Sequence, residues 1–413
     1  MKKFLKKSNP YIKRLPNLNN KKLIFIFIIF IGLALFLIPS TLCEPAETGD
    51  LTQQLEESVY EQLGNIDLTQ FDEILQGLDQ DAQNLFNSTS FWDKVVQLLD
   101  GDFGGDFTTF IGAFFDCFFG ELVNFVPLLC IVIAVVLLCS LVGNIRSETG
   151  SDSVGKVINF VCYGVVIVVV SASVFSLLDE VSACVGSIKS QMDLLFPILL
   201  TLLASVGGAV SVGVFQPTLA ILGNLTVKIF STFLIPLFIF SFVFMVVGHM
   251  TDSVKLNKFN TLFNSIFKWV AGICFSIFMG AMVFQGIVAG SFDGVSIRAT
   301  KFALKSYIPI LGGYLSDGFN VVMASSVLIK NAVGMAGIIL AVGTILMPIV
   351  QIAVFSLGIK LTASILEPMT KSRIPDFLMS VSKLLNMLVV IIAGIGFMYL
   401  VSVGMLLCTA NLG

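Results

Sequence analysis

Six long apolar runs dominate the sequence, and no other feature limits the possible folds as strongly. They lie at about 121–143, 156–178, 226–248, 269–290, 336–358 and 384–408. Each has the roughly 20 residues with which an α-helix crosses a hydrocarbon core about 30 Å thick. Hydrophobic residues make up 56% of the chain and charged residues only 12%. The sequence therefore predicts an all-α polytopic membrane protein.

One apolar stretch occurs twice, at 193–224 and again at 305–336. Pro197 matches Pro309 at an offset of 112 residues, and further apolar positions match at the same offset. We interpret this repetition as an internal duplication.

Each copy has a candidate break near its middle. Gly207 and Gly208 divide the first copy into halves of about 14 residues. Ser316, Asp317 and Gly318 fill nearly the same place in the second copy. A helix of that length is about 21 Å long, which is shorter than the hydrocarbon core. We therefore expect two re-entrant helical hairpins in addition to about six transmembrane helices.

Composition divides the chain into three regions. Residues 1–43 have the form of a signal sequence or signal anchor, because eight basic residues precede an apolar run. Residues 44–110 are predicted to form a small acidic, extracytoplasmic helical domain. Residues 111–413 are predicted to form a multi-pass membrane domain. Within it we expect internal repeats at about 156–248 and 269–358 and a final helix at 384–408.

The region 44–110 carries most of the acidic residues. Between residues 44 and 121 there are 17 acidic residues and a single basic one, Lys94. This charge argues against nucleic acid as a partner. Ser90 can cap a short helix that Gly101 ends.

The basic residues predict the orientation of the helices, because Lys and Arg remain in the cytoplasm. If the first hairpin returns to its own side, the basic loop at 255–268 falls inside. Residues 291–305 then fall outside although they are basic. We interpret them as an interfacial amphipathic helix, because the basic residues recur at helical spacing, at Arg298, Lys301 and Lys305.

Ionisable residues near membrane depth are the functional candidates, because they are costly in lipid. Asp317 and Lys330 could pair across the second hairpin and line a path. Alternatively, both extend to an interface and only fix the hairpin. The candidate pore or hairpin positions are Pro197, Gly207, Gly208, Asp317, Lys330 and Asn331.

Other small and polar residues could support such a path. Gln216 and Asn224 could supply polar lining. Gly334 and Gly337 form a small-residue face, for which close helix packing is favoured over contact with a ligand.

Residue patterns typical of catalysis or metal binding do not occur. The chain has one histidine, His249, no HExxH-like motif and no CxxC pair among its eight cysteines. The sequence predicts a protein that is not an enzyme and holds no metal and no cofactor.

A set of residues centred on the second copy resembles a known family. These family-matching positions are Asp293, Gly294, Arg298, Lys301, Pro309, Gly312, Gly334 and Gly337. The FPILLTLLASVGG run and the order of signal, acidic domain and membrane block add to the likeness. Together they resemble the stage III sporulation protein AE family of endospore-forming bacteria.

The resemblance implies a role that the residues alone do not give. It implies a complex in the mother-cell-derived membrane around the forespore, which joins a ring-forming, secretion-like channel. The implied partners are other membrane proteins of the stage III sporulation operon and, through the complex, stage II sporulation protein Q. Family members have no established catalytic residues, so the matching positions are expected to be structural or pore-lining.

Three functional hypotheses follow. The first is a transport-type or channel-base subunit needed for forespore development. The second is a non-conducting membrane scaffold that recruits other channel subunits through its acidic domain. A distant third is an independent small-molecule permease.

Overall fold

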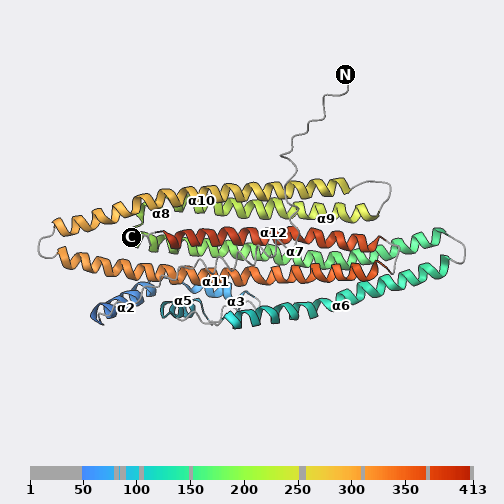
Figure 1. Ribbon diagram of the computed structural model, residues 1–413, viewed down its shortest axis with the longest axis horizontal. Helices are drawn as coiled ribbons and strands as arrows, with labels where there is room; N and C mark the ends of the chain where they lie inside the picture. Colours follow the sequence, from blue (N-terminus) through green and yellow to red (C-terminus); the bar gives the residue numbers. More distant parts are fainter. Residues whose placement is uncertain are drawn as a thin grey trace, which may run out of the picture. The chain divides into compact units, whose positions relative to one another are not determined.

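The computed structural model describes residues 49–78, 83, 90–101, 107–147, 152–250, 257–307, 312–368 and 373–409. All regular elements in these ranges are helices, and no strand occurs among them (Figure 1). The all-α class is thereby confirmed. The signal region 1–43 lies outside the described residues.

Three short helices whose ends lie in the described part of the chain precede the long ones. They are α2 (Gly49–Gly64), α3 (Thr69–Gln76) and α5 (Phe91–Leu99). The longer elements are α6 (Phe107–Ser147), α7 (Asp152–Ser205), α8 (Ala209–Ile229), the π-helical turn η2 (Phe230–Leu234), α9 (Ile235–Met250), α10 (Asn257–Tyr307), α11 (Gly312–Leu366) and α12 (Ile374–Cys408).

Six segments of the described chain are long and apolar enough to cross a membrane. They are Phe115–Leu138, Phe160–Ser205, Ala209–Met250, Lys258–Val288, Gly318–Leu366 and Ile374–Cys408. Each of the six predicted apolar runs overlaps a different one of these segments. The multi-pass character of the chain is therefore confirmed.

The first predicted reversal is present at the glycine pair. Gly207 has a φ of 92°, a left-handed conformation that a residue without a Cβ adopts at little cost. Its N–H donates to the Ala204 carbonyl (2.9 Å), and the Gly208 N–H donates to the Leu203 carbonyl (3.0 Å). This pair of bonds is the Schellman motif that ends many helices.

The arms on either side of this reversal are not separate short helices. A re-entrant hairpin needs two more reversals, one of them at about 179–193, but α7 is continuous over 54 residues. The prediction of a separate re-entrant hairpin is wrong here. The charged residues at 179–193 lie on the helix surface without breaking it, and Lys189 pairs with Asp193 one turn away at 2.6 Å.

The second predicted break is also wrong. α10 ends at Tyr307, and α11 begins at Gly312 and runs without interruption through Ser316, Asp317 and Gly318. Among the described glycines only Gly101 and Gly207 have a positive φ. Glycine inside a helix costs only about 1 kcal/mol, so these residues do not force a turn.

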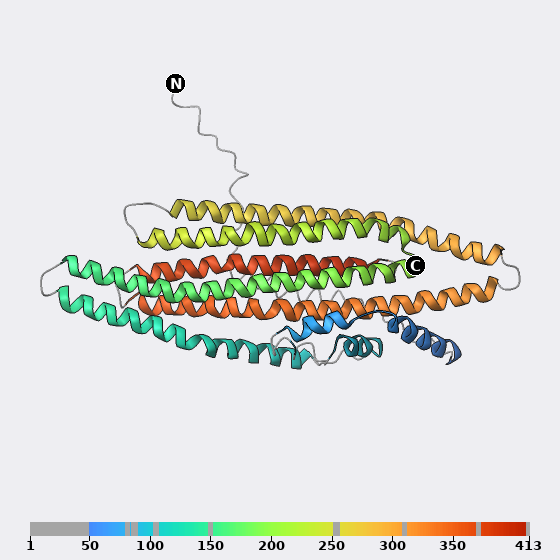
Figure 2. The same cartoon turned by 180° about the vertical axis from the view of Figure 1, so that it is seen from behind.

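The helix α11 is the centre of the bundle. It packs against α12, α7 and α6 along much of its length and also contacts α2, α5 and α10 (Figures 1 and 2). One buried apolar cluster joins α6 to α11 through Cys117, Leu346, Met347, Val350 and Val354. The core of the structure therefore lies around α11.

The predicted cap of the third short helix is confirmed. The Ser90 hydroxyl accepts a hydrogen bond from the Asp93 N–H (3.1 Å), and α5 ends before Gly101, whose φ is 79°. The Phe91 ring stacks on Phe71 of α3 with ring centroids 4.3 Å apart. The Asp72 carboxylate also accepts a bond from the Phe91 N–H (2.6 Å). These contacts join α3 to α5.

A cluster of hydrogen bonds holds α2 against the beginning of α11. The Gln62 amide nitrogen donates to the Ser325 hydroxyl (2.7 Å), and the amide oxygen accepts from the Ser326 hydroxyl (2.8 Å). Ser58 lies 3.1 Å from Ser325, oxygen to oxygen. We call Ser58, Gln62, Ser325 and Ser326 the α2–α11 junction. Because α2 is rich in exposed carboxylates, the junction indicates that α11 begins outside the lipid.

The junction can be tested with a double cysteine variant. Ser58→Cys with Ser325→Cys should form a disulfide in the membrane-bound chain, because the two side chains already approach within bonding reach. The cross-linked peptide is detected by mass spectrometry after proteolysis. Glu57→Cys with Ser325→Cys is the control, since Glu57 is exposed, and it should not cross-link. Absence of the bond in the first pair would show that α2 does not lie on α11.

Candidate functional site

A concave feature lies between the two arms of the first hairpin, α7 and α8. We call it the hairpin groove, and its volume is about 460 Å³. Its lining residues are Lys189, Met192, Asp193, Phe196, Pro197, Leu200, Thr201 and Ala204 of α7 and Val212, Gln216, Leu219, Ala220, Gly223 and Asn224 of α8. Three residues named from the sequence, Pro197, Gln216 and Asn224, meet in it, while Gly207 and Gly208 form the turn between the arms.

Several polar groups in the groove are already hydrogen-bonded to their own helix. The Thr201 hydroxyl donates to the Pro197 carbonyl (2.8 Å), which lies one turn earlier. The Asn224 amide donates to the Ala220 carbonyl (2.9 Å) in the same way. Such bonds leave small, weakly polar surfaces facing outward. The groove is therefore better suited to packing against another surface than to binding a charged solute.

The charged residues of the groove are confined to one ion pair. Lys189 and Asp193 lie 2.6 Å apart, and their side chains are 44% and 52% exposed. An exposed pair of this kind contributes about 0–1 kcal/mol to stability. Its consequence for the groove is that the lining carries no net charge.

The inner side of the hairpin is clamped to α11 and α12. Phe196 stacks on the buried ring of Tyr399 (6.1 Å between centroids), and the Tyr399 hydroxyl donates to the Gly337 carbonyl (3.2 Å). A Cβ atom on Gly337 would meet Leu195, and one on Gly334 would meet Leu407. Both glycines thus serve close helix packing, as favoured from the sequence.

Lys330 is buried and holds the end of another helix. Its side chain is fully covered, and its Nζ donates to the carbonyls of Thr409 (2.7 Å) and Leu407 (3.2 Å). The last carbonyls of a helix have no partner within the helix and carry partial negative charge. Lys330 therefore acts as a side-chain cap for α12.

The proposed pairing of Lys330 with Asp317 does not occur in this arrangement. Both residues belong to the unbroken helix α11, so 13 residues separate their backbones by about 20 Å along the axis. The neighbouring Asn331 is half-buried. Its Oδ1 atom is covered and has no hydrogen-bond partner within the described part of the chain.

The family-matching positions before the second reversal lie in α10. Asp293, Gly294, Arg298 and Lys301 are part of its helical backbone, and Gly312 begins α11. Pro309 lies outside the described residues. Residues 291–305 thus continue α10 and do not form a separate interfacial helix, which corrects that expectation. The helical spacing of Arg298, Lys301 and Lys305 is also what a continuation of α10 through these residues would give.

Two buried polar contacts between helices could not be predicted from the sequence. The Gln191 amide of α7 donates to the Thr344 hydroxyl of α11 (2.8 Å). The hydroxyls of Ser356 and Ser382 lie 2.7 Å apart and join α11 to α12. Hydrogen bonds between membrane helices contribute about 0.6 kcal/mol on average. Nothing in the sequence identifies which of these polar residues are partners.

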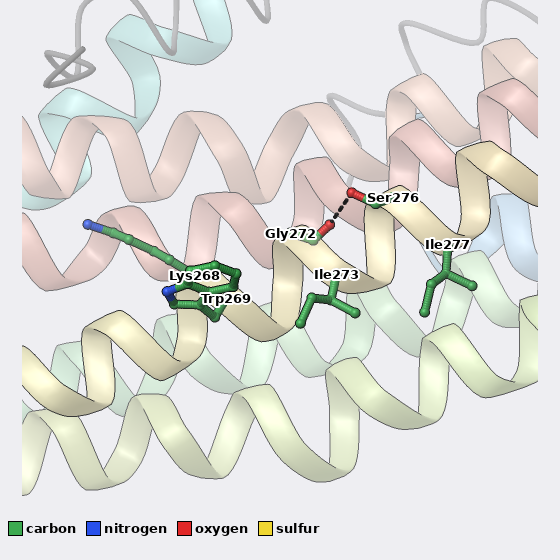
Figure 3. A pocket seen from close by; sticks show the side chains of 6 residues that line it. All are labelled: Lys268, Trp269, Gly272, Ile273, Ser276 and Ile277. Atoms are coloured by element: carbon green, nitrogen blue, oxygen red, sulfur yellow. Dashed lines mark hydrogen bonds between the residues drawn. The ribbon is translucent and has the colours of Figure 1, made fainter. Parts of the chain in front are cut away.

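A second, shallower depression lies on α10 alone. Figure 3 shows its lining, with Lys268 and Trp269 extending beside each other along the helix. Trp269 is 70% exposed. The Ser276 hydroxyl is bonded back to the Gly272 carbonyl (2.8 Å). A Trp and a Lys beside exposed isoleucines are typical of a helix surface near a membrane interface, so this face is not a candidate site for a soluble ligand.

Metal chemistry finds no support in the described residues. They contain no group of three or more His, Cys, Asp or Glu side chains that could hold a metal ion. That the chain is not an enzyme stays a prediction.

Comparison with known proteins gives one consistent family. The model of the stage III sporulation protein AE family matches residues 89–410. The stage III sporulation protein AE of Bacillus subtilis (strain 168) is 26% identical to this chain over 319 residues, which cover 77% of this chain and 80% of that protein. No solved structure matches the chain.

The cap formed by Lys330 predicts a loss of stability on its removal. Lys330→Met keeps most of the side-chain volume but leaves two carbonyls of α12 without this donor. Each unsatisfied buried group costs about 1–3 kcal/mol. We expect the detergent-solubilised variant to unfold at a clearly lower temperature than the wild type. Lys383→Met, on the exposed face of α12, should unfold like the wild type, and equal unfolding of the two variants would contradict the cap.

Proposed function

The chain belongs to the stage III sporulation protein AE family, and from this premise we propose that it is a membrane subunit of the sporulation channel complex between mother cell and forespore. In this proposal the protein is a channel-base component that forespore development requires. It resides in the mother-cell-derived membrane around the forespore. Its partners are the other stage III membrane proteins and, through them, stage II sporulation protein Q.

The extent of the family match supports a role for the membrane helices. The match begins at residue 89, directly before α5, and ends at residue 410, directly after α12. It therefore includes all six segments that could span a membrane and leaves out α2 and α3. What this chain shares with its family is the helix bundle, and the proposed function resides there.

The single observation that carries the channel-base proposal is the length of the helices. The helices α7, α10 and α11 have 54, 51 and 55 residues. At about 1.5 Å per residue each is roughly 75–85 Å long, whereas a hydrocarbon core is about 30 Å thick. Much of each helix therefore projects from the bilayer. A projecting, well-packed bundle is a suitable base on which other subunits can assemble.

A transport path through this chain alone has less support. The hypothesis rested on two broken helices and on a pair formed by Asp317 and Lys330. Of these features only the reversal at Gly207 is present. The hairpin groove, whose lining carries no net charge, remains as a concave feature that a transport-type role could use. We therefore propose a base for the channel, without a catalytic activity or a cofactor, and not an independent permease.

A scaffold role through the acidic helices is the second candidate. The α2–α11 junction fixes one side of α2, and the exposed side carries Glu56, Glu57 and Glu61. These carboxylates could recruit a basic segment of another subunit. In this case the acidic helices, and not the bundle, would carry the function.

One variant separates the two candidates. Glu56→Gln, Glu57→Gln and Glu61→Gln together remove three exposed charges and leave the half-buried residue Gln62 in place. A channel base predicts unchanged co-purification of the other stage III membrane proteins from sporulating cells, with normal forespore development. A scaffold predicts loss of both. Gln62→Leu is the matched variant that weakens the attachment of α2 itself.

Co-purification tests whether the chain is a member of the proposed complex. The tagged wild-type chain should recover the other stage III membrane proteins from membranes of sporulating cells. Recovery of the chain without any of them would contradict the proposal.

A further inference from the structure

We propose that the depression on α10 binds an anionic phospholipid, with the lipid phosphate at Lys268 and Trp269 and an acyl chain along the apolar residues that follow. The depression has a volume of about 410 Å³, and we call it the α10 groove. The proposal concerns only the chain and the bilayer around it. It does not rest on the proposed function.

The lining of the α10 groove is polar at one end and apolar along one wall. Lys268 and Trp269 form the polar end, and Ile273 and Ile277 form the wall. Figure 3 shows the amine of Lys268 and the indole nitrogen of Trp269 extended toward the same end of the helix, away from both isoleucines. A groove of this kind matches a molecule that is charged at one end and apolar along its length.

The floor of the groove is open because Gly272 has no side chain. A Cβ atom built on Gly272 meets nothing within 4 Å. The Ser276 hydroxyl donates to the Gly272 carbonyl (2.8 Å), so its proton is not presented to a ligand. The wall beside this floor is well exposed, by 51% at Ile273 and 59% at Ile277. The hollow therefore offers an apolar surface along which an acyl chain can lie.

The two polar groups at the end of the groove are available to a ligand. Neither Lys268 nor Trp269 has a hydrogen bond or an ion pair with another side chain in the described part of the chain. Both side chains are exposed, that of Trp269 by 70%. An ammonium group and an indole N–H are donors, and phosphate oxygens accept hydrogen bonds from both. An indole ring is also suited to a boundary between an apolar and a wet region.

The charge of the surrounding helices favours an anionic lipid over a zwitterionic one. Residues 209–250 and 257–292 contain Lys228, Lys258 and Lys268 and no Asp or Glu. These residues form α8, α9 and most of α10, which lie side by side (Figure 1). Each basic residue near an anionic membrane surface strengthens binding roughly fivefold. A zwitterionic headgroup would bring its own cation toward these lysines, whereas an anionic headgroup would not.

The polar end of the groove lies at the depth where a lipid phosphate is expected. The segment of α10 that is apolar enough to span a membrane is Lys258–Val288. Residues 269–288 alone are about 30 Å long, which is the thickness of a hydrocarbon core. After Lys268 the next charged residue is Asp293. A Trp and a Lys at the start of such a segment are typical of the membrane–water interface. A phosphate at Lys268 therefore leaves its acyl chains beside the apolar wall.

Fluorescence quenching by brominated lipids tests the proposal in the full-length chain. The chain has two tryptophans, Trp92 and Trp269, so Trp92→Phe leaves Trp269 as the single reporter. In phosphatidylcholine vesicles, a minor amount of brominated phosphatidylglycerol should quench Trp269 about twofold or more strongly than the same amount of brominated phosphatidylcholine, because the anionic lipid is enriched in the groove. Equal quenching by the two lipids would overturn the proposal.

A charge substitution tests whether Lys268 selects the lipid. Lys268→Gln should abolish the difference between the two brominated lipids, because the cation beside the phosphate is lost. Lys258→Gln is the matched control, since Lys258 is also exposed on α10 but does not line the groove, and it should keep the difference. The same loss in both variants would indicate a general attraction between basic residues and an anionic surface. That outcome would overturn a specific site.

Filling the groove tests its role independently of charge. Gly272→Leu places a side chain on the open floor and should also abolish the difference between the two lipids. Gly280→Leu is the control, because a Cβ atom there likewise meets nothing within 4 Å and Gly280 does not line the groove. It should quench like the parent chain. A lipid preference that survives Gly272→Leu would contradict binding in the groove. The unfolding temperature of each variant in detergent confirms that the bundle remains folded.

Inorganic phosphate distinguishes a lipid from a soluble anion at Lys268. Added phosphate should reduce the extra quenching no more than sodium chloride of equal ionic strength, because phosphate lacks the acyl chain that the groove holds. If phosphate alone removes the extra quenching, the site takes free phosphate, and the lipid proposal is wrong. The chain is expressed in cells that do not sporulate, so these outcomes are independent of the sporulation complex.

Discussion

Close contact between helices at glycine positions is the constraint on which this bundle depends. Within a bilayer the solvent is as apolar as a leucine side chain, so helices associate through tight packing and a few polar contacts. Gly337 receives Leu195 of α7, Gly358 receives Leu129 of α6, and Gly396 of α12 receives Ile345 of α11. A side chain at any of these positions would require its neighbour to move. The central place of α11 follows from these contacts.

The sequence predicted the helices well because length and apolar composition decide them. All six runs form helices, and Ser90 and Gly207 act as the cap and the reversal that their residue types indicate. Prediction from the sequence was wrong where a helix continues through residues that often end one. The residues at 316–318 resemble a turn, but a helix tolerates them, and Lys189 with Asp193 is compatible with a continuous helix surface. The turn and helix propensities of the residues alone do not distinguish the reversal at Gly207 from the unbroken helix at 316–318.

The candidate site was predictable only in part, for a related reason. Pro197, Gln216 and Asn224 were found because they are exceptions in an apolar run, and all three line the hairpin groove. The partner of Lys330 was not predictable. It consists of backbone carbonyls at the end of α12, 77 and 79 residues later in the chain. Every residue has a backbone carbonyl, so the residue types do not indicate which carbonyls accept these bonds. A polar residue in an apolar run can be recognised from the sequence. Its partner cannot, because the partner depends on which helices are neighbours in the fold.

The α2–α11 junction and the hairpin turn together constrain where the bilayer can lie. Gln62 and its three serine partners are polar and belong to an acidic helix, so the beginning of α11 must be near water. Leu195 of the hairpin packs on Gly337, which lies about two turns beyond Lys330 along α11. The antiparallel course of α7 then brings its last residues back toward the beginning of α11. The uncharged turn at Gly207 therefore lies toward the same end of the bundle as the junction.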